Sequence, residues 1–210
     1  MQKTIIIVAA AAAMALLFSS CQKGTPENEP APTDSNTGTA AVTVEDAGIT
    51  KCGWVQLWAD GPKFATMNLG ETKVTGNTKT YAWTKSGSDT DAATKNWGSA
   101  WKVPTESEMN ELCLATSSTG STKISCSYTE KDGVYGFLYT GKTAGYTGNS
   151  LFLPVDHYGY ADYGFVYYWS GTADNDKGRM LDLGYNSGTW GNFWHSQGTG
   201  SLYPVRPVLK

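Results

Sequence analysis

The sequence predicts an α+β fold in which two short helices are set among many short antiparallel strands. Three observations indicate this class. The chain of 210 residues has 24 Gly, 17% charged residues, 8 Trp, 12 Tyr and 6 Phe, which argues against a helical bundle and against a wholly disordered chain. Apolar and polar residues alternate over short stretches that Gly and Asn interrupt. Strands come first, then two helices, then more strands, unlike the regular alternation of a parallel α/β sheet.

The strands are expected where the alternation of apolar and polar residues is clearest. These stretches are residues 54–59, 64–69, 123–128, 134–140, 151–155, 167–170, 179–183 and 203–209. Pro204 and Pro207 confine the last strand to an edge or to a bulged position, because proline cannot donate to a ladder of hydrogen bonds.

The two helices have sequence signals at their ends. Thr105 and Glu108 form an S/T-x-x-E capping box, in which each side chain binds the backbone N–H of the other residue. Met109 and Leu112 then give an apolar stripe at helical spacing. A second helix is expected over residues 92–97, with Asp91 as its N-cap and Gly98 as its stop.

The N-terminal residues have the pattern of a bacterial export signal. Lys3 precedes an uninterrupted apolar run over residues 5–18, which is short for a membrane-spanning helix. Residues 17–21, Leu-Phe-Ser-Ser-Cys, resemble a lipobox, and the resemblance implies cleavage before Cys21 and acylation of its sulfur. Several acyl chains on one residue would anchor the protein stably in a membrane. The alternative is an ordinary secretory signal in which the cysteine is incidental.

A tether is expected between the anchor and the folded part. Residues 21–45 contain Pro26, Pro30 and Pro32 and no aromatic residue, so they cannot bury enough apolar surface to offset the entropy of ordering. The predicted organisation is a signal peptide at residues 1–20, a tether at 21–45 and a folded domain at 46–210. We expect a protein of the cell envelope, attached by lipid to the outer membrane.

Several blocks in the folded part resemble the Fibrobacter succinogenes major paralogous domain, which belongs to the formylglycine-generating-enzyme type of the C-type lectin-like fold, also described as sulfatase-modifying-factor-like. The blocks keep the family's order and cover most of residues 54–208. They are Ala-Thr-Met-Asn-Leu-Gly at 65–70, Tyr-Ala-Trp at 81–83, Trp-Gly-Ser-Ala-Trp-Lys-Val-Pro-Thr at 97–105, Gly-Val-Tyr-Gly-Phe at 133–137, Ser-Leu-Phe-Leu-Pro at 150–154, Tyr-Tyr-Trp-Ser at 167–170 and Val-Arg-Pro-Val at 205–208.

This resemblance implies a domain whose two chain ends pair and whose long loops carry the binding site. It implies no particular activity. The formylglycine-generating enzymes use a cysteine pair late in the domain, whereas this chain has no cysteine after Cys126. The sequence also has no G-x-S-x-G and no H-E-x-x-H motif. We therefore expect no catalytic residues and a protein that is not an enzyme.

Two features leave alternatives open. Cys113 and Cys126 are close enough in sequence to form a disulfide around a short loop, or they are buried thiols beside Cys52. Asp174 and Asp176 either begin a calcium loop, since hard cations prefer oxygen ligands, or belong to a polar turn. No other cofactor is expected.

An aromatic and polar tract supplies the candidate ligand-binding residues. Tyr and Trp have a flat apolar face and a polar edge, which suit a sugar ring or a protein surface. The candidates are Tyr158, Tyr160, Tyr185, Asn186, Trp190, Asn192, Trp194 and His195. Trp169 is expected in the core, and Tyr167 is expected to point inward.

Three functions are compatible with these features. The first is a lipid-anchored module that binds a glycan or a cell-surface protein without catalysis. The second is a retroelement-diversified binding protein, because residues 185–203 resemble the variable tail of such proteins. The third is a structural component of the envelope or an adhesin. A nucleic-acid partner is excluded by a formal charge of −3 and the lack of a basic run.

Overall fold

The structure is a computed structural model that describes residues 36–155 and 159–210, all of them within one unit, Asp34–Lys210. Strands make up 44% of the described residues and helices 11%. The expected α+β class is therefore wrong, and the folded unit is mostly β. The signal peptide, Cys21 and Tyr158 lie outside the described residues.

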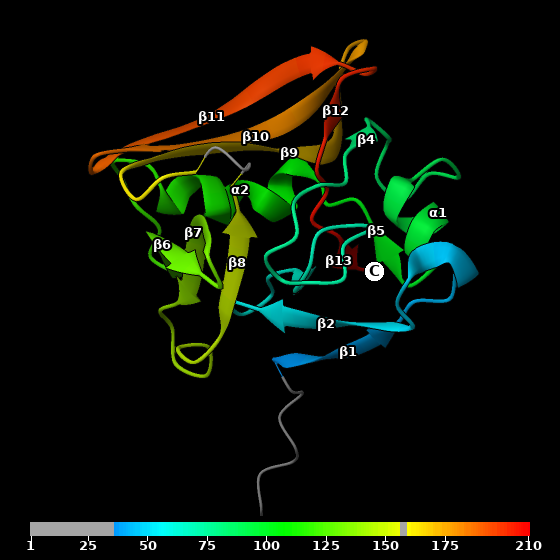
Figure 1. The fold of residues 1–210 in the computed structure, drawn as a ribbon, viewed down its shortest axis with the longest axis horizontal. Coiled ribbons are helices and arrows are strands. Elements are labelled where there is room, and N and C mark those ends of the chain that lie inside the picture. The colour runs from blue at the N-terminus through cyan, green and yellow to red at the C-terminus, as the bar shows by residue number, and fades with distance from the viewer. Residues whose placement is uncertain (1–35, 156–158) are drawn as a thin grey trace, which may run out of the picture. The chain divides into compact units, whose positions relative to one another are not determined.

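Four antiparallel sheets organise the folded unit (Figure 1). The first has the order β1 (Thr37–Ala41), β2 (Lys51–Gln56), β3 (Lys63–Ala65), β13 (Val208–Leu209) and β5 (Trp101–Lys102). The second consists of β6 (Ile124–Lys131), β7 (Val134–Gly141) and β8 (Ser150–Pro154). The third consists of β9 (Tyr163–Asp174), β10 (Lys177–Asn186) and β11 (Thr189–Gly198), with β10 in the middle. The short strands β4 (Tyr81–Ala82) and β12 (Leu202–Tyr203) form the fourth.

The folded part begins earlier than residue 46. Strand β1 pairs along its whole length with β2, from Thr37 opposite Val55 to Ala41 opposite Lys51. A 3-10 helix at Glu45–Ala47 follows it. Part of the expected tether is thus built into a sheet. The C-terminal strand β13 lies in the same sheet, but β2 and β3 separate it from β1.

Both expected helices are confirmed. Helix α2 (Glu106–Ala115) has Thr105 as its N-cap, and Glu108 completes the capping box with a 2.8 Å hydrogen bond from the Thr105 backbone nitrogen. Helix α1 (Ala92–Trp97) is capped by Asp91, and the backbone N–H of Gly98 closes its last turn. Helix α2 lies against the three-stranded β9–β10–β11 sheet (Figure 1) and buries Met109, Leu112 and Cys113 there.

The wrong fold class has a specific cause in residues 185–203, which we expected as binding loops. Most of this tract is strand, because β10 continues to Asn186 and β11 occupies Thr189–Gly198. Ser187 and Gly188 adopt positive φ angles of 45° and 88° and make the two-residue turn between these strands. The period-two alternation of β11 was already present in the sequence, but its Gly, Asn and Ser residues favoured a loop.

Candidate functional site

The β9–β10–β11 sheet has one covered face and one open face. Leu181 and Leu183 of β10 and Val166 and Tyr168 of β9 point from the inner face into the main core, together with α2. Side chains alternate along strands, so the intervening residues belong to the opposite face. We call this the outer face. Its open part comprises Tyr163, Phe165, Tyr167, Asp182, Gly184, Asn186, Thr189, Gly191, Phe193 and His195.

One end of the outer face is covered by the rest of the protein. Trp169 and Met180 lie directly opposite each other in the sheet and belong to a second core cluster. The indole of Trp169 donates a 2.8 Å hydrogen bond to the carbonyl of Tyr81, and its ring meets the edge of Tyr203. The open part of the outer face therefore starts at Tyr167 and runs toward the turn at residues 187–188.

Aromatic rings form a ladder along β9. The ring centroids of Tyr163 and Phe165 are 6.0 Å apart, those of Phe165 and Tyr167 are 5.8 Å apart, and Tyr167 continues to Tyr203 at 5.4 Å. On the other edge of the sheet, Phe193 is 58% exposed. A group of large apolar rings that are exposed side by side indicates a binding site more often than a single exposed ring does.

A single carboxylate lies among these rings. Asp182 is directly opposite Tyr167 on one side and Phe193 on the other. Its carboxylate oxygen is 3.5 Å from Nδ1 of His195, and only 16% of its side chain is exposed. Burial raises the pKa of Asp182, and the nearby His195 opposes this shift in part. Ser196 lies on the opposite face and donates a hydrogen bond to Asp174, so its hydroxyl is not part of the Asp182–His195 pair.

Two hollows adjoin the aromatic ladder. The first, of about 490 Å³, is lined by Tyr163, Phe165 and Tyr167 and by the outer-face residues Gly184, Asn186, Thr189 and Gly191. The second, of about 620 Å³, lies on the other side of β9, between Phe165, Tyr167, Tyr203 and Leu202 and the segment that contains Asn77, Thr78 and Thr80. Phe165 and Tyr167 line both hollows and form a ridge between them. These volumes are within the range of small-molecule sites.

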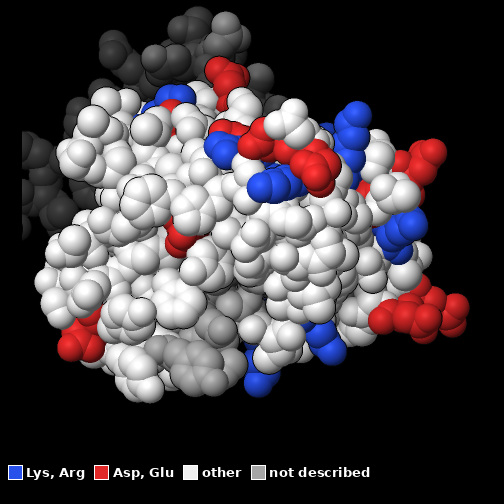
Figure 2. Space-filling model, turned by 90° about the horizontal axis from the view of Figure 1, so that it is seen from above, with Lys and Arg blue, Asp and Glu red and all other residues white. Residues whose placement is uncertain are grey.

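The surface around the hollows carries few charges. Figure 2 looks down on this side of the molecule and shows a broad uncharged area, with most charged side chains gathered toward its margins. Neither hollow is lined by Lys, Arg, Asp or Glu. An uncharged ligand with a flat apolar face suits this surface better than a strongly charged one.

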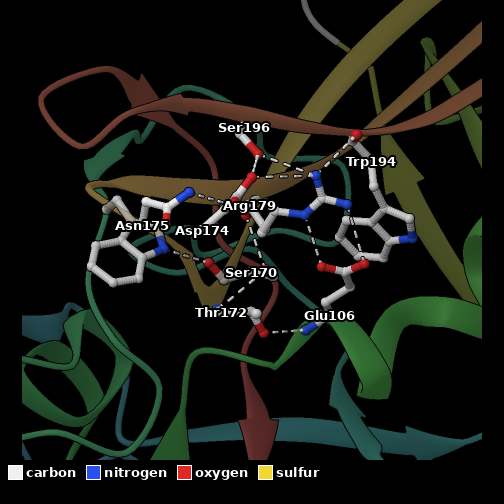
Figure 3. A network of polar contacts seen from close by, with 9 residues as sticks. Glu106, Ser170, Thr172, Asp174, Asn175, Arg179, Trp194 and Ser196 are labelled. Atoms are coloured by element: carbon white, nitrogen blue, oxygen red, sulfur yellow. Dashed lines mark hydrogen bonds and ion pairs between the residues drawn. The ribbon is translucent and has the colours of Figure 1, made fainter.

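Arg179 fastens the sheet to α2 from the inner face (Figure 3). Its Nε is 2.9 Å from one carboxylate oxygen of Glu106, and its Nη2 is 3.3 Å from the other. Its Nη1 donates to the carbonyl of Trp194 and to the hydroxyl of Ser196 on β11. A two-pronged contact of this kind fixes geometry as well as charge. One guanidinium thus connects β10, β11 and the start of α2, and it holds the sheet rigid.

A second layer of hydrogen bonds supports this junction. The backbone nitrogen of Glu106 donates to Thr172 at 2.9 Å, and the hydroxyl of Ser170 donates to the carbonyl of Arg179 at the same distance. Figure 3 shows these residues in one chain of contacts from α2 to the strands. The outer face therefore belongs to a sheet that these hydrogen bonds join to α2.

The structure separates the predicted ligand-binding residues into two groups. Asn186 and His195 lie on the outer face, and Tyr160 is 59% exposed just before β9. Trp194 and Asn192 lie on the inner face. Trp194 packs against the main core, and the Asn192 amide donates to the carbonyl of Cys113 in α2.

Tyr185 and Trp190 border the first hollow, but their rings pack against other aromatic rings. Tyr185 stacks on Tyr128 at 4.5 Å, and Trp190 lies 6.0 Å from Phe137. Burial raises the pKa of Tyr128 to about 12, so its phenol stays protonated and donates to a carbonyl of β9. These rings join two sheets, which is a structural role.

The ladder residues Tyr163, Phe165 and Phe193 were not among the predicted site residues, and Tyr167, which we expected to point inward, is partly exposed on the outer face. The sequence prediction also missed Asp182, Gly184 and Gly191, which lie on the outer face. The alternation of residues 163–167 and 189–195 was the available signal. Alternation alone does not say which of the two faces is covered, because that depends on where α2 packs.

The structure describes both places where the sequence left alternatives open, the cysteines and the acidic pair. Cys52, Cys113 and Cys126 are free thiols. Burial raises the pKa of all three. Asp174 ends β9, and Asn175 and Asp176 form the turn to β10, with a φ of 55° at Asn175. Asp174 is engaged by Ser196, so the polar turn is the observed structure.

The described residues lack two features, a cluster of metal-ligating side chains and a membrane-spanning helix. Residues 36–155 and 159–210 contain no group of three or more His, Cys, Asp or Glu side chains placed to hold a metal ion. Within the same ranges, every helix is too short or too polar to cross a membrane.

No family model, no curated protein and no solved structure matches this chain. The resemblance to the major paralogous domain thus rests on its short sequence blocks alone. What the protein does has to be inferred from the site itself.

Proposed function

We propose that this protein is a lipid-anchored module of the bacterial cell envelope that binds a glycan without breaking a bond. The observation that carries the proposal is the aromatic surface of the outer face, where Tyr163 and Phe165 of β9 and Phe193 of β11 stand on the two strands that flank β10. A sugar ring has an apolar face that packs on an aromatic ring and hydroxyls that hydrogen-bond at its edge.

Polar side chains that could hydrogen-bond to sugar hydroxyls border both hollows. Asn186 and Thr189 border the first hollow, while Thr78 and Thr80 border the second. Asp182 offers acceptor oxygens between two rings. A few polar groups set around a mainly apolar surface are the usual composition of a small-molecule site.

The contacts that hold the sheet beneath the outer face also support binding. Arg179 fixes β10 and β11 to α2, so the rings do not have to be ordered when the ligand arrives. A surface that is already ordered loses less entropy on binding. Because this site relies on stacking and hydrogen bonds, we propose no catalytic role for the His195–Asp182 pair.

The anchor is the second part of the proposal. Acylation of Cys21 would attach the chain to a membrane, and the outer membrane is the location we propose. Protease shaving of intact cells, followed by detection of the domain, tests whether it faces outward. Globomycin treatment, which blocks lipoprotein processing, should cause the unprocessed form to accumulate, and a Cys21→Ala variant should lose its membrane attachment.

Binding is tested by comparing neighbouring residues on the two faces of β11. The Phe193→Ala variant should lose at least tenfold in affinity for a polysaccharide that the wild-type protein retains in affinity electrophoresis, with an unchanged unfolding midpoint. In urea unfolding, the Trp194→Ala variant should have a free energy of unfolding that is lower by about 3 kcal/mol, because the variant loses a ring that packs on the core. Trp54→Ala, on the separate β2 strand, serves as the control for loss of an aromatic ring.

A cell-surface protein is the second candidate ligand, and a feature of β11 favours it. This strand forms an edge of its sheet and contains ten residues, Thr189–Gly198, with no Lys, Asp, Glu or Pro among them. Edge strands usually carry such residues to prevent pairing with other chains. Crosslinking on intact cells that captures one protein partner, combined with no retention by any polysaccharide, would favour this candidate over the glycan.

A further inference from the structure

Two glycines face each other on the outer face, inside two long strands and near the turn that joins them. Gly184 of β10 is directly opposite Gly191 of β11. A glycine inside a strand costs about 0.5–1 kcal/mol relative to alanine, since it loses more conformational freedom on folding. Such positions therefore often have a specific reason, such as the close approach of a ligand or another backbone.

The fold itself gives no reason for these two glycines. Neither has a positive φ angle. A Cβ atom on Gly184 would find its nearest neighbour at 3.7 Å, and one on Gly191 would find its nearest at 3.8 Å, which are ordinary van der Waals distances. Gly164 and Gly178 of the same sheet differ, because a Cβ there would collide with Tyr128 or Trp83.

The glycine pair forms the floor of the first hollow. The backbone is bare there, while Phe165 stands directly opposite Gly184 on β9 and Thr189 stands at the turn end of β11. Any side chain at either glycine would rise into the hollow of about 490 Å³. The bare backbone at Gly184 and Gly191, beside the ring of Phe165, has room for one sugar ring that lies flat against it.

The second hollow extends the site across the strands. The Phe165–Tyr167 ridge separates it from the first hollow, and Tyr203 and Leu202 lie on its far side. Neighbouring strands are about 4.8 Å apart, so the path from β11 over β10 to β9 covers about 10 Å before it reaches the second hollow. A ligand that fills both hollows is longer than one sugar ring and runs across the strands.

The charges define the ligand further. Neither hollow has a Lys or Arg in its lining, and the outer face carries the carboxylate of Asp182 directly opposite Tyr167, which lines both hollows. An acidic sugar would lose hydration without gaining a cation and would be repelled by Asp182. We infer that the ligand is a neutral, extended oligosaccharide with one ring on the Gly184–Gly191 floor and further rings across the Phe165–Tyr167 ridge. This inference rests on the proposed function.

The test uses the acylated full-length protein in detergent, neutral oligosaccharides and isothermal titration calorimetry. The probes are glucose, mannose, xylose and N-acetylglucosamine oligomers of one to six units, with galacturonate oligomers of the same lengths as acidic counterparts. For at least one neutral series, affinity should rise tenfold or more between one unit and three. Galacturonate oligomers should bind at least tenfold more weakly.

Glycine variants test the floor. Gly184→Val and Gly191→Val should each lower the affinity for the best neutral oligomer tenfold or more, with an equal or higher unfolding midpoint, because valine favours strands. Gly198→Val is the matched control, since a Cβ there meets nothing within 4 Å and Gly198 borders neither hollow. It should leave the affinity unchanged.

The outcomes separate the two proposals. If a single sugar binds as tightly as the longest oligomer, or if both valine variants bind like the wild type, the inference is wrong while the proposed function stands. Tighter binding of galacturonate than of every neutral oligomer would overturn the charge argument in the same way. If no probe binds and a polysaccharide is not retained either, the proposed function fails together with the inference.

Discussion

At the scale of single residues, the outer face keeps a carboxylate, that of Asp182, where burial disfavours its charge. The Asp182 side chain is mostly covered, and one of its carboxylate oxygens is 3.5 Å from Nδ1 of His195. Arg179, by contrast, is paired with Glu106 through two nitrogen–oxygen contacts. A group that costs stability in its position is a candidate for function, because functional sites often carry such groups.

The loss of stability caused by burying the Asp182 carboxylate can be measured through the pH dependence of unfolding. Burial raises the pKa of Asp182 above its ordinary value of 3.8, so the folded chain binds this proton more tightly than the unfolded chain does. The resulting stability is present below pH 3.8 and is lost as the pH rises through the higher folded value. At pH 7, Asp182→Asn should therefore raise the midpoint of thermal unfolding by about 2 °C.

This gain should vanish near pH 3, where the wild-type carboxyl is protonated too. Differential scanning calorimetry at both pH values measures it. Asp176→Asn is the control, because Asp176 lies exposed in the turn between β9 and β10. An equal gain at both pH values, or a loss at pH 7, would show that charge burial is not the cause.

At the scale of elements, α2 packs on the inner face of the β9–β10–β11 sheet, and the start of α2 depends on the capping box. The hydroxyl of Thr105 accepts a 3.2 Å hydrogen bond from the backbone nitrogen of Glu108. Thr105→Ala leaves this N–H without its partner and should lower the free energy of unfolding by about 1 kcal/mol. Urea unfolding followed by tryptophan fluorescence measures the loss.

Thr105→Ser retains the hydroxyl and should recover most of that stability. Both variants should bind an oligosaccharide like the wild type, because Thr105 lines neither of the two hollows beside the ladder. A serine variant as unstable as the alanine variant would show that the threonine methyl, and not the cap, is responsible.

Both bounds of α1 and the start of α2 could be predicted to the residue because their signals are local. Asp91 and Gly98 bound α1 within eight positions, and Thr105 with Glu108 sets the start of α2. Strand β11 depends instead on pairing with β10, and the many small polar residues of Thr189–Gly198 indicated turns. A strand of this composition is recognisable only when its partner is known.

The sequence predicted an aromatic and polar tract but not which of its residues share a face. Among the candidate residues, His195 and Asn186 lie on the outer face. Trp190 and Trp194 do not, since each is an odd number of residues from Gly191 or Phe193 and so points to the other face. Which face is open depends on α2, which is distant in sequence.

At the scale of the whole folded unit, the described chain begins far from the proposed binding face. Strand β1 and the β9–β10–β11 sheet are at opposite ends of the view in Figure 1. Strand β1 therefore contributes to the fold and not to the outer face.

Strand β1 should be required for a stable fold, although its composition resembles a linker. The carbonyl of Ala41 accepts a 2.9 Å hydrogen bond from the indole of Trp101, which is fully buried. Val42 is 6% exposed, and the backbone nitrogen of Thr43 donates to the carbonyl of Trp97. A chain that starts at residue 46 loses the acceptor for a buried N–H, at about 1–3 kcal/mol, and the burial of Val42, at about 1.5–3 kcal/mol.

We therefore expect a chain of residues 46–210 to be about 2.5–6 kcal/mol less stable than one of residues 36–210. The longer chain should match the full-length protein in urea unfolding, because β1 keeps its complete pairing with β2. Hydrogen exchange should show loss of protection at β2 and around Trp97 and Trp101 in the shorter chain. Equal stability of the two truncated chains would place the start of the folded domain at residue 46 after all, with β1 as a dispensable addition to the sheet.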